Sequence, residues 1–238
     1  MKSSYRVYRW FWESLDWLYP PRCGGCCKPG TRWCRDCQES VVRVSPPFCP
    51  RCGQSQTVES ICHNCRVNMP RFEMLRSWAV FEGPIRQALH RLKYRCDLGL
   101  GEILSRPLIE VLRGSTWPIN VVVPVPLSIA RQSQRGYNQA ALLAKPLALA
   151  AGLAYRPKAI QRVRDTVTQV GLSLEQRRHN VVDAFQACSE IVSGKTVLLI
   201  DDVATTGATL DACTDALLSQ GASEVYCLAV ARAVSLIS

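Results

Sequence analysis

Residues 197–209 constrain the fold of this chain more than any other segment. They read Val-Leu-Leu-Ile, then Asp201 and Asp202, then Val-Ala-Thr-Thr-Gly-Ala-Thr. Four aliphatic residues without a polar face are typical of a strand that is buried on both sides of a parallel sheet. Apolar residues then recur at helical spacing from Leu210 to Leu217, which indicates a helix. We therefore predict an α/β fold whose central strand ends at the two aspartates.

The loop between this strand and the helix predicts an anion site. Backbone N–H groups at the start of a helix have no partners within the helix, and a phosphate can satisfy them. Gly207 lets the backbone approach a ligand closely. Two adjacent acids beside such a loop suit sugar hydroxyls or a phosphate-bound Mg²⁺. A ribose 5-phosphate fits both features, with its phosphate at the loop and its hydroxyls at the acids. The alternative interpretation is that the two aspartates only cap the helix.

Eight of the thirteen cysteines form four Cys-x-x-Cys pairs: Cys23/Cys26, Cys34/Cys37, Cys49/Cys52 and Cys62/Cys65. This spacing lets both thiolates of a pair reach one tetrahedral Zn²⁺, and two pairs complete a Cys₄ site. Four pairs therefore predict two structural zinc ions. The short intervening loops favour sequential pairing, with pairing of alternate pairs as the alternative.

Length and cysteine usage bound the class of protein. A chain of 238 residues has room for one α/β domain and a small accessory module. It contains no run of eighteen apolar residues and no secretory signal pattern, so we expect no transmembrane segment. Reduced, metal-binding cysteines agree with a cytoplasmic protein. The expected N-terminal helix at 1–21 is basic and rich in tryptophan, so a peripheral position at the inner face of the cytoplasmic membrane is an alternative. The favoured interpretation is that this helix packs against the zinc module or the larger domain.

The positive charge is unevenly distributed. The formal net charge is +10, yet residues 183–238 carry two basic and seven acidic groups. Residues 129–178 carry nine basic groups against two acidic ones, more than one pyrophosphate needs. Such a surplus suits a longer polyanion such as single-stranded DNA, although charged runs are usually solvated surface. Residues 162–180 are polar and basic and could form a mobile lid or a disordered connector.

Other segments show weaker local signals. A helix that starts at Gly83-Pro84 would bury Ile85, Leu89 and Leu92, and its other side would show three cations, Arg86, Arg91 and Lys93. We expect further helices at 98–112 and 140–151, a ligand loop at 127–138 and a strand at 154–160.

Several motifs together resemble the ComF family. They are the cysteine pairs, Val-Pro-Val-Pro-Leu-Ser at 123–128, Arg-Gly-Tyr-Asn-Gln-Ala at 135–140, Arg-x-Thr-x-x-Gln at 164–169, Arg-x-x-Asn-Val at 177–181, Ala-Phe at 184–185, and residues 197–209. The last of these is similar to the signature of type I phosphoribosyltransferases. The resemblance implies a parallel-sheet phosphoribosyltransferase domain preceded by a small zinc-ribbon module. We expect an N-terminal aromatic helix at 1–21, a double zinc ribbon at 22–70 and a phosphoribosyltransferase-like domain at 71–238.

The resemblance also implies a pocket for phosphoribosyl pyrophosphate or a related ribose phosphate. Its expected binding residues are Asp201, Asp202, Val203, Ala204, Thr205, Thr206, Gly207, Ala208 and Thr209. The two aspartates are the catalytic candidates. Three arginines are candidates for contacting pyrophosphate: Arg131, Arg135 and Arg164. Mg²⁺ and two zinc ions are the expected cofactors.

The sequence leaves three functions open. The first is handling of single-stranded DNA during natural transformation, which the resemblance implies and the basic surplus supports. The second is Mg²⁺-dependent phosphoribosyl transfer to an unknown acceptor, in which positioning and charge neutralisation would supply most of the catalysis. The third is an adaptor whose zinc ribbons dock a DNA-uptake helicase or pore protein. Whether any reaction is catalysed is left open.

Overall fold

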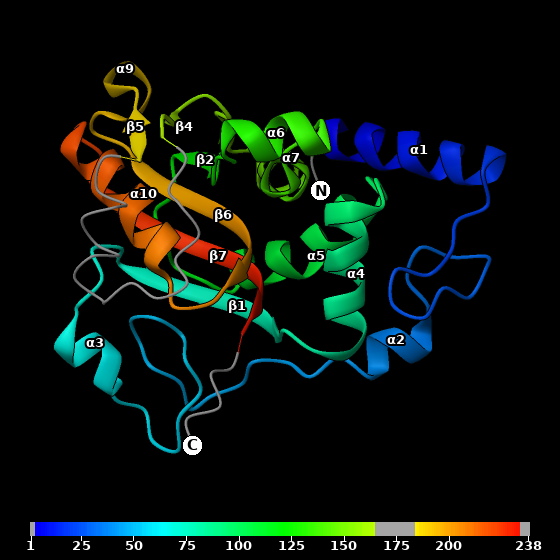
Figure 1. Ribbon diagram of the computed structural model, residues 1–238, viewed down its shortest axis with the longest axis horizontal. Helices are drawn as coiled ribbons and strands as arrows, with labels where there is room; N and C mark the ends of the chain where they lie inside the picture. The colour runs from blue at the N-terminus through cyan, green and yellow to red at the C-terminus, as the bar shows by residue number, and fades with distance from the viewer. Residues whose placement is uncertain (1–2, 165–183, 234–238) are drawn as a thin grey trace.

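The computed structural model describes residues 3–164 and 184–233, and its centre is a parallel sheet (Figure 1). The strands, in their order across the sheet, are β1 (Met74–Val80), β7 (Glu224–Arg232), β6 (Thr196–Ala204), β2 (Val121–Pro124) and β3 (Ala154–Tyr155). The predicted central strand, β6, pairs with β7 on one side and β2 on the other. All pairs are parallel, so the carboxyl ends of the strands meet at one edge. The predicted α/β fold is confirmed.

Helices cover both faces of the sheet. One face packs against α1 (Ser3–Leu18), α4 (Gly83–Tyr94), α5 (Leu100–Arg113) and α7 (Gln139–Ala151). The other face packs against α9 (Ser189–Val192), α10 (Ala208–Ser219) and a hairpin of β4 (Ile160–Arg162) and β5 (Phe185–Ala187). Two short helices, α2 (Arg35–Glu39) and α3 (His63–Val67), lie in separate places at the periphery (Figure 1).

Strand β6 is longer than the sequence predicts. It continues past the two aspartates to Ala204 because Val203 and Ala204 still pair with β7. Leu198 and Ile200 point into the core under α4, whereas Leu199 points into the core under α10. Successive side chains of a strand alternate between faces, so Asp201 and Asp202 lie on opposite sides of the sheet at its carboxyl edge.

Two further segments differ from the sequence prediction. The expected loop at 127–138 contains a short helix, α6 (Ile129–Arg135), which Ser128 caps by accepting a hydrogen bond from the Arg131 backbone N–H at 3.3 Å. The single strand expected at 154–160 is two strands, β3 and β4, in different sheets. Pro157 lies between them, and a proline has no N–H to continue a ladder. Most of the predicted lid falls outside the described residues.

Helix α1 is tied to the domain through a buried carboxylate. The Tyr5 hydroxyl donates to Glu102 of α5 at 2.9 Å, and Arg106 donates to both oxygens of the same carboxylate at 2.9–3.1 Å. Burial, together with the charge of Glu102, raises the pKa of Tyr5 to about 12. The Tyr5 hydroxyl therefore remains a donor at neutral pH. No helix in the described part of the chain is long and apolar enough to cross a membrane.

Tyr5→Phe should destabilise the protein by about 1.5 to 3 kcal/mol, because the substitution removes a donor to a buried charged acceptor. Tyr19→Phe is the matched control, since Tyr19 is exposed at the end of α1. Urea unfolding of both variants measures the difference, provided that the denaturant slope stays constant. Equal midpoints for the two variants would show that the Tyr5 hydroxyl does not anchor α1.

Candidate phosphoribosyl site and zinc centres

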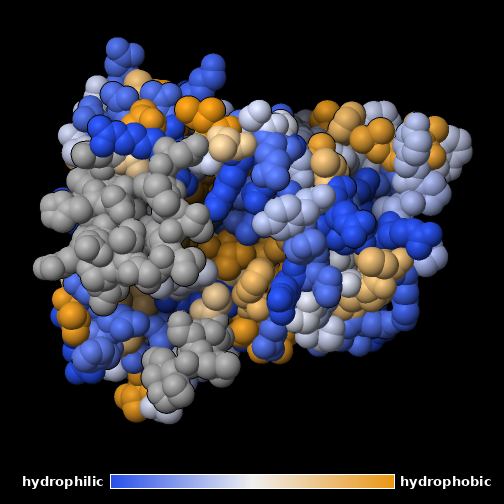
Figure 2. Space-filling view, in the orientation of Figure 1, coloured by the Kyte–Doolittle hydropathy of each residue, from blue (hydrophilic) through white to orange (hydrophobic). Residues whose placement is uncertain are grey.

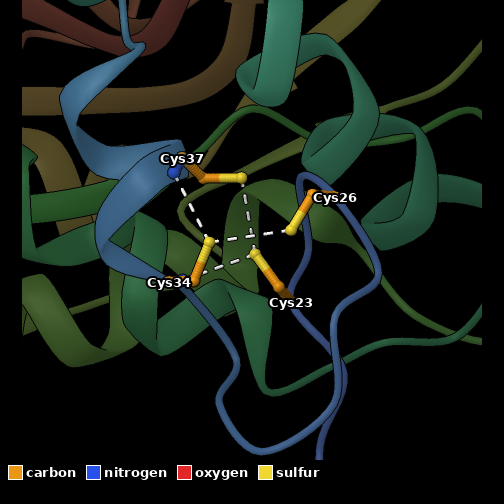
Figure 3. Close-up of side chains that lie close together, drawn as sticks. All are labelled: Cys23, Cys26, Cys34 and Cys37. Carbon is orange, nitrogen blue, oxygen red and sulfur yellow. Dashed lines mark hydrogen bonds between the residues drawn. The ribbon is translucent and has the colours of Figure 1, made fainter.

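The first two cysteine pairs converge on one centre, shown in Figure 3. The sulfurs of Cys23 and Cys37 lie 3.6 Å apart, as do those of Cys26 and Cys34. Cys34 caps the amino end of α2 and accepts a hydrogen bond from the Cys37 backbone N–H. The two-residue spacing therefore places both thiols of the second pair on one side of a single helical turn.

The last two pairs form a second, fully buried cluster from Cys49, Cys52, Cys62 and Cys65. The sulfurs of Cys52 and Cys62 are 3.7 Å apart. Cys62 precedes α3 as Cys34 precedes α2, and its backbone N–H donates to the Cys49 sulfur at 3.4 Å. The structure thus brings together the sequential pairs and not the alternate ones.

Both clusters fit a zinc ion. A tetrahedral Zn²⁺ with bonds of about 2.3 Å places its sulfurs about 3.8 Å apart, close to the separations observed. A disulfide would need about 2.05 Å. Backbone N–H groups directed at the sulfurs, as from Cys34 to Cys23 at 3.4 Å, favour thiolates. Each zinc would serve as a structural crosslink in a module with little apolar core.

We expect two zinc ions per chain from metal analysis of protein purified without chelators. Cys65→Ser should lower the content to about one and destabilise the second ribbon, because a Cys₄ site that loses one thiolate binds zinc less tightly. Cys188→Ser is the control, since Cys188 belongs to neither cluster. A content below one zinc per wild-type chain would contradict the assignment.

The loop at 205–209, named the phosphate loop after its expected ligand, lies between β6 and α10, in the strand–loop–helix order that the sequence predicts. Gly207 is left-handed, with φ of +84°, where a residue with a Cβ would be strained. Thr206 uses its hydroxyl to accept from the Ala208 backbone N–H at 3.3 Å. Four other backbone N–H groups have no hydrogen-bond acceptor among the described residues: those of Thr205, Thr206, Gly207 and Thr209. This carboxyl edge borders a hollow with an apolar floor in Figure 2.

Arg71 and Phe72, which directly follow the second ribbon, contact the phosphate loop and α10. The ring of Phe72 lies next to Gly207, where an added Cβ would come within 3.8 Å of it. Phe72 belongs to the same core cluster as the second set of cysteines. The adjacent Arg71 donates its backbone N–H to Asp211 of α10 at 2.6 Å, and its guanidinium pairs with Asp215 at 3.2 Å. Residues 71–72 thus connect the ribbon to the amino end of α10.

Further contacts join this ribbon to the ends of β1 and β7. The Arg51 carbonyl accepts from the Leu75 backbone N–H at 2.8 Å. The buried guanidinium of Arg232, at the end of β7, donates to the Cys52 carbonyl at 2.6 Å. Gly53 leaves no room for a Cβ, which would lie 2.6 Å from the Leu75 carbonyl oxygen. The backbone of the ribbon therefore packs directly on the edge of the sheet.

The acid pair, Asp201 and Asp202, places two carboxyl groups close together in a largely buried position. Burial raises the pKa of Asp201 well above its usual value, and the adjacent Asp202 carboxylate raises it further. Asp202 is buried and forms an ion pair with Lys93 of α4. The Asp202 backbone N–H donates to Asp201 at 2.8 Å. The edge therefore holds two carboxylates and one compensating ammonium.

The described residues do not form a ready Mg²⁺ site at this edge. The groups of three or more metal-ligating side chains found among them are the two cysteine clusters. Asp201 and Asp202 lie on opposite faces of β6, and Lys93 already pairs with Asp202. This arrangement does not support the expected Mg²⁺.

The three arginine candidates lie in different surroundings. Arg135, in α6, stacks over Tyr94 of α4 at 5.0 Å and donates to Gln139 at 3.0 Å. Arg131 is exposed on the same helix. Arg164 is exposed beside β4, and its carbonyl accepts from the Arg162 side chain at 3.2 Å. The structure thus places Arg135, but neither of the others, against the helix that carries Lys93.

Sequence analysis missed Lys93 as a site residue. We expected Arg86, Arg91 and Lys93 together on the outer side of α4, yet only Arg86 of the three is exposed. Arg91 donates to the Cys23 carbonyl at 2.6 Å and pairs with Asp97. Lys93 follows the buried Leu89 by four residues, and that spacing was a signal that its side chain faces inward.

Comparison with known proteins agrees with this architecture. Residues 14–66 match the double zinc ribbon domain and residues 129–235 match the phosphoribosyl transferase domain. The protein therefore belongs to a class in which a double zinc ribbon is joined to a domain with the phosphoribosyltransferase fold.

Three relatives extend over most of the chain. DNA utilization protein YhgH of Salmonella typhi is 36% identical over 79% of this chain and 86% of that protein. Competence protein F of Haemophilus influenzae is 31% identical over 84% of this chain and 90% of that protein. Competence protein ComFC of Bacillus subtilis is 28% identical over 82% and 81% of the respective chains. The chain belongs to the ComF family.

Proposed function

We propose that this protein binds phosphoribosyl pyrophosphate, or a related ribose phosphate, at the carboxyl edge of β6. The observation that carries the proposal is the loop at 205–209, where Gly207 is left-handed and four backbone N–H groups beside the acid pair have no acceptor among residues 3–164 and 184–233. The loop amides and threonine hydroxyls would hold the 5-phosphate. Asp201 and Asp202 would accept hydrogen bonds from the ribose hydroxyls. Arg135, with Arg131 and Arg164, would contact the pyrophosphate.

Replacing both acids, in Asp201→Asn with Asp202→Asn, should weaken binding of phosphoribosyl pyrophosphate by about 2 to 5 kcal/mol, because the ribose hydroxyls lose charged acceptors. Titration calorimetry measures the change. The matched control is Glu110→Gln with Glu190→Gln, which removes the same charge from exposed positions. Wild-type affinity in the aspartate double variant would refute the pocket assignment.

We further propose that the protein takes part in single-stranded DNA handling during natural transformation. The names of two relatives, competence protein F and DNA utilization protein YhgH, support this role. The basic surplus of residues 129–178 supports it too, and several of its described members are exposed: Arg131, Arg156, Lys158 and Arg164. Arg177 and Arg178 lie outside the described residues. The zinc ribbons could also dock a DNA-uptake helicase or pore protein, and such an interaction is compatible with the DNA role.

Salt titration with a labelled single-stranded oligonucleotide tests the DNA role. If about four side chains contact phosphates, log affinity should fall against log salt with a slope of about −3. The aspartate double variant should bind the oligonucleotide at least as well as wild type, since it only removes negative charge. A slope near zero, or no binding at low salt, would favour the alternative function, phosphoribosyl transfer to a small-molecule acceptor.

We place the protein in the cytoplasm, in a peripheral position at the inner face of the membrane. Support for this position comes from α1, whose inner side packs on the domain through Tyr5 while its outer side exposes an apolar stripe. The stripe consists of Val7, Trp10, Phe11, Trp17 and Leu18. Aromatic residues on one side of an amphipathic helix suit the boundary between lipid headgroups and acyl chains.

A further inference from the structure

Lys93 forms an ion pair with one member of the acid pair, Asp202. Sequence analysis did not assign Lys93 to the site. Its side chain is 22% exposed, and its ammonium pairs with an Asp202 side chain that is 5% exposed. Breaking a buried ion pair by removing one partner is costly, so Asp202 holds this ammonium at the edge of the sheet. The ammonium has three N–H donors, and the carboxylate does not require all of them.

The carboxyl end of α4 also contacts the segment after β2. Tyr94 lies under the Arg135 guanidinium at 5.0 Å, and the Tyr137 hydroxyl donates to the Leu92 carbonyl. Residues 92–94 therefore join the acid pair of β6 to the basic helix α6. Lys93 lies between the element expected to hold ribose and the element expected to hold pyrophosphate.

The charges at this edge require a cation near the ligand. Asp201 and Asp202 together repel a polyanion, and the described residues offer no cluster of carboxylates for a divalent ion there. An ammonium that bridges Asp202 and a phosphate oxygen would offset this repulsion without a protein-bound metal.

Resting on the proposed function, we infer that Lys93 determines ligand specificity at this pocket. It neutralises Asp202 in the ligand-free protein and bridges Asp202 to the pyrophosphate of the bound ligand. The pocket therefore prefers phosphoribosyl pyrophosphate to ribose 5-phosphate, which lacks that group. Arg135 and Lys93 approach the pyrophosphate from adjacent elements.

Calorimetry with these two ligands tests the inference. Lys93→Met should lower the affinity for phosphoribosyl pyrophosphate about ten- to a hundredfold, the loss of one charge-assisted hydrogen bond, and change ribose 5-phosphate affinity little. Arg86→Met removes a charge from the exposed side of the same helix and should match wild type with both ligands. Equal losses for both ligands, or no loss, would overturn the inference.

A second experiment shows whether Lys93 contacts the ligand or only neutralises Asp202. Lys93→Met is also made in Asp202→Asn, where both charges are absent and the variant should fold even if Lys93→Met alone does not. The loss in phosphoribosyl pyrophosphate affinity should persist there; a silent Lys93→Met in this background would show that Lys93 serves only Asp202. If wild type binds neither ligand, the proposed function fails and this inference with it, whereas binding by wild type with unchanged selectivity in Lys93→Met rejects the inference alone.

Discussion

The second cysteine cluster and the phosphate loop share one core, and the candidate site depends on that packing. Four buried thiols lie in the same apolar cluster as Phe72, Leu75 and Ala204. Phe72 packs in this cluster and also lies against Gly207, so one side chain links the ribbon to the loop. Thiolates in an apolar core would repel one another without a cation, and a zinc ion supplies that charge. This ribbon therefore shares the hydrophobic core of the sheet domain.

The first ribbon packs on the helical face, where Gly24 lies against Leu100 of α5, and partly buried ion pairs strengthen this contact. Arg91 of α4 links the Cys23 carbonyl to Asp97, and Arg32 pairs with both Asp97 and Asp16 of α1. Helix α4 therefore contacts the first ribbon with one side chain and the acid pair with another. Two of its three cations, Arg91 and Lys93, have separate contacts because residues two apart on a helix point in different directions.

Sequence patterns predicted the elements whose signals are local. Helical spacing predicted α1, α4, α5 and α7, the aliphatic run predicted β6, and two-residue spacing predicted the cysteine pairs. The extension of β6 to Ala204 was not predictable in this way, because it depends on pairing with Ala231 and Arg232 of β7. The same limit applies to β1, whose first residues mix polar and apolar side chains and are held by β7 and the second ribbon.

The site shows the same division between local and distant signals. The loop conformation at Gly207 follows from its own sequence, but the support from Phe72 and Arg71 comes from a distant segment. Lys93 has an inward-facing helical position, yet its partner Asp202 lies far along the chain, and spacing alone does not identify it. Sequence could therefore name candidate site residues, but not the residues that hold those candidates in place.

A crystal structure with ribose 5-phosphate tests the central claim most directly. The phosphate should lie within hydrogen-bond distance, about 2.7 to 3.2 Å, of the backbone N–H groups at 205–209. The sugar hydroxyls should face Asp201 and Asp202. A phosphate bound elsewhere, with the loop at Gly207 unchanged and its N–H groups facing water, would contradict the account.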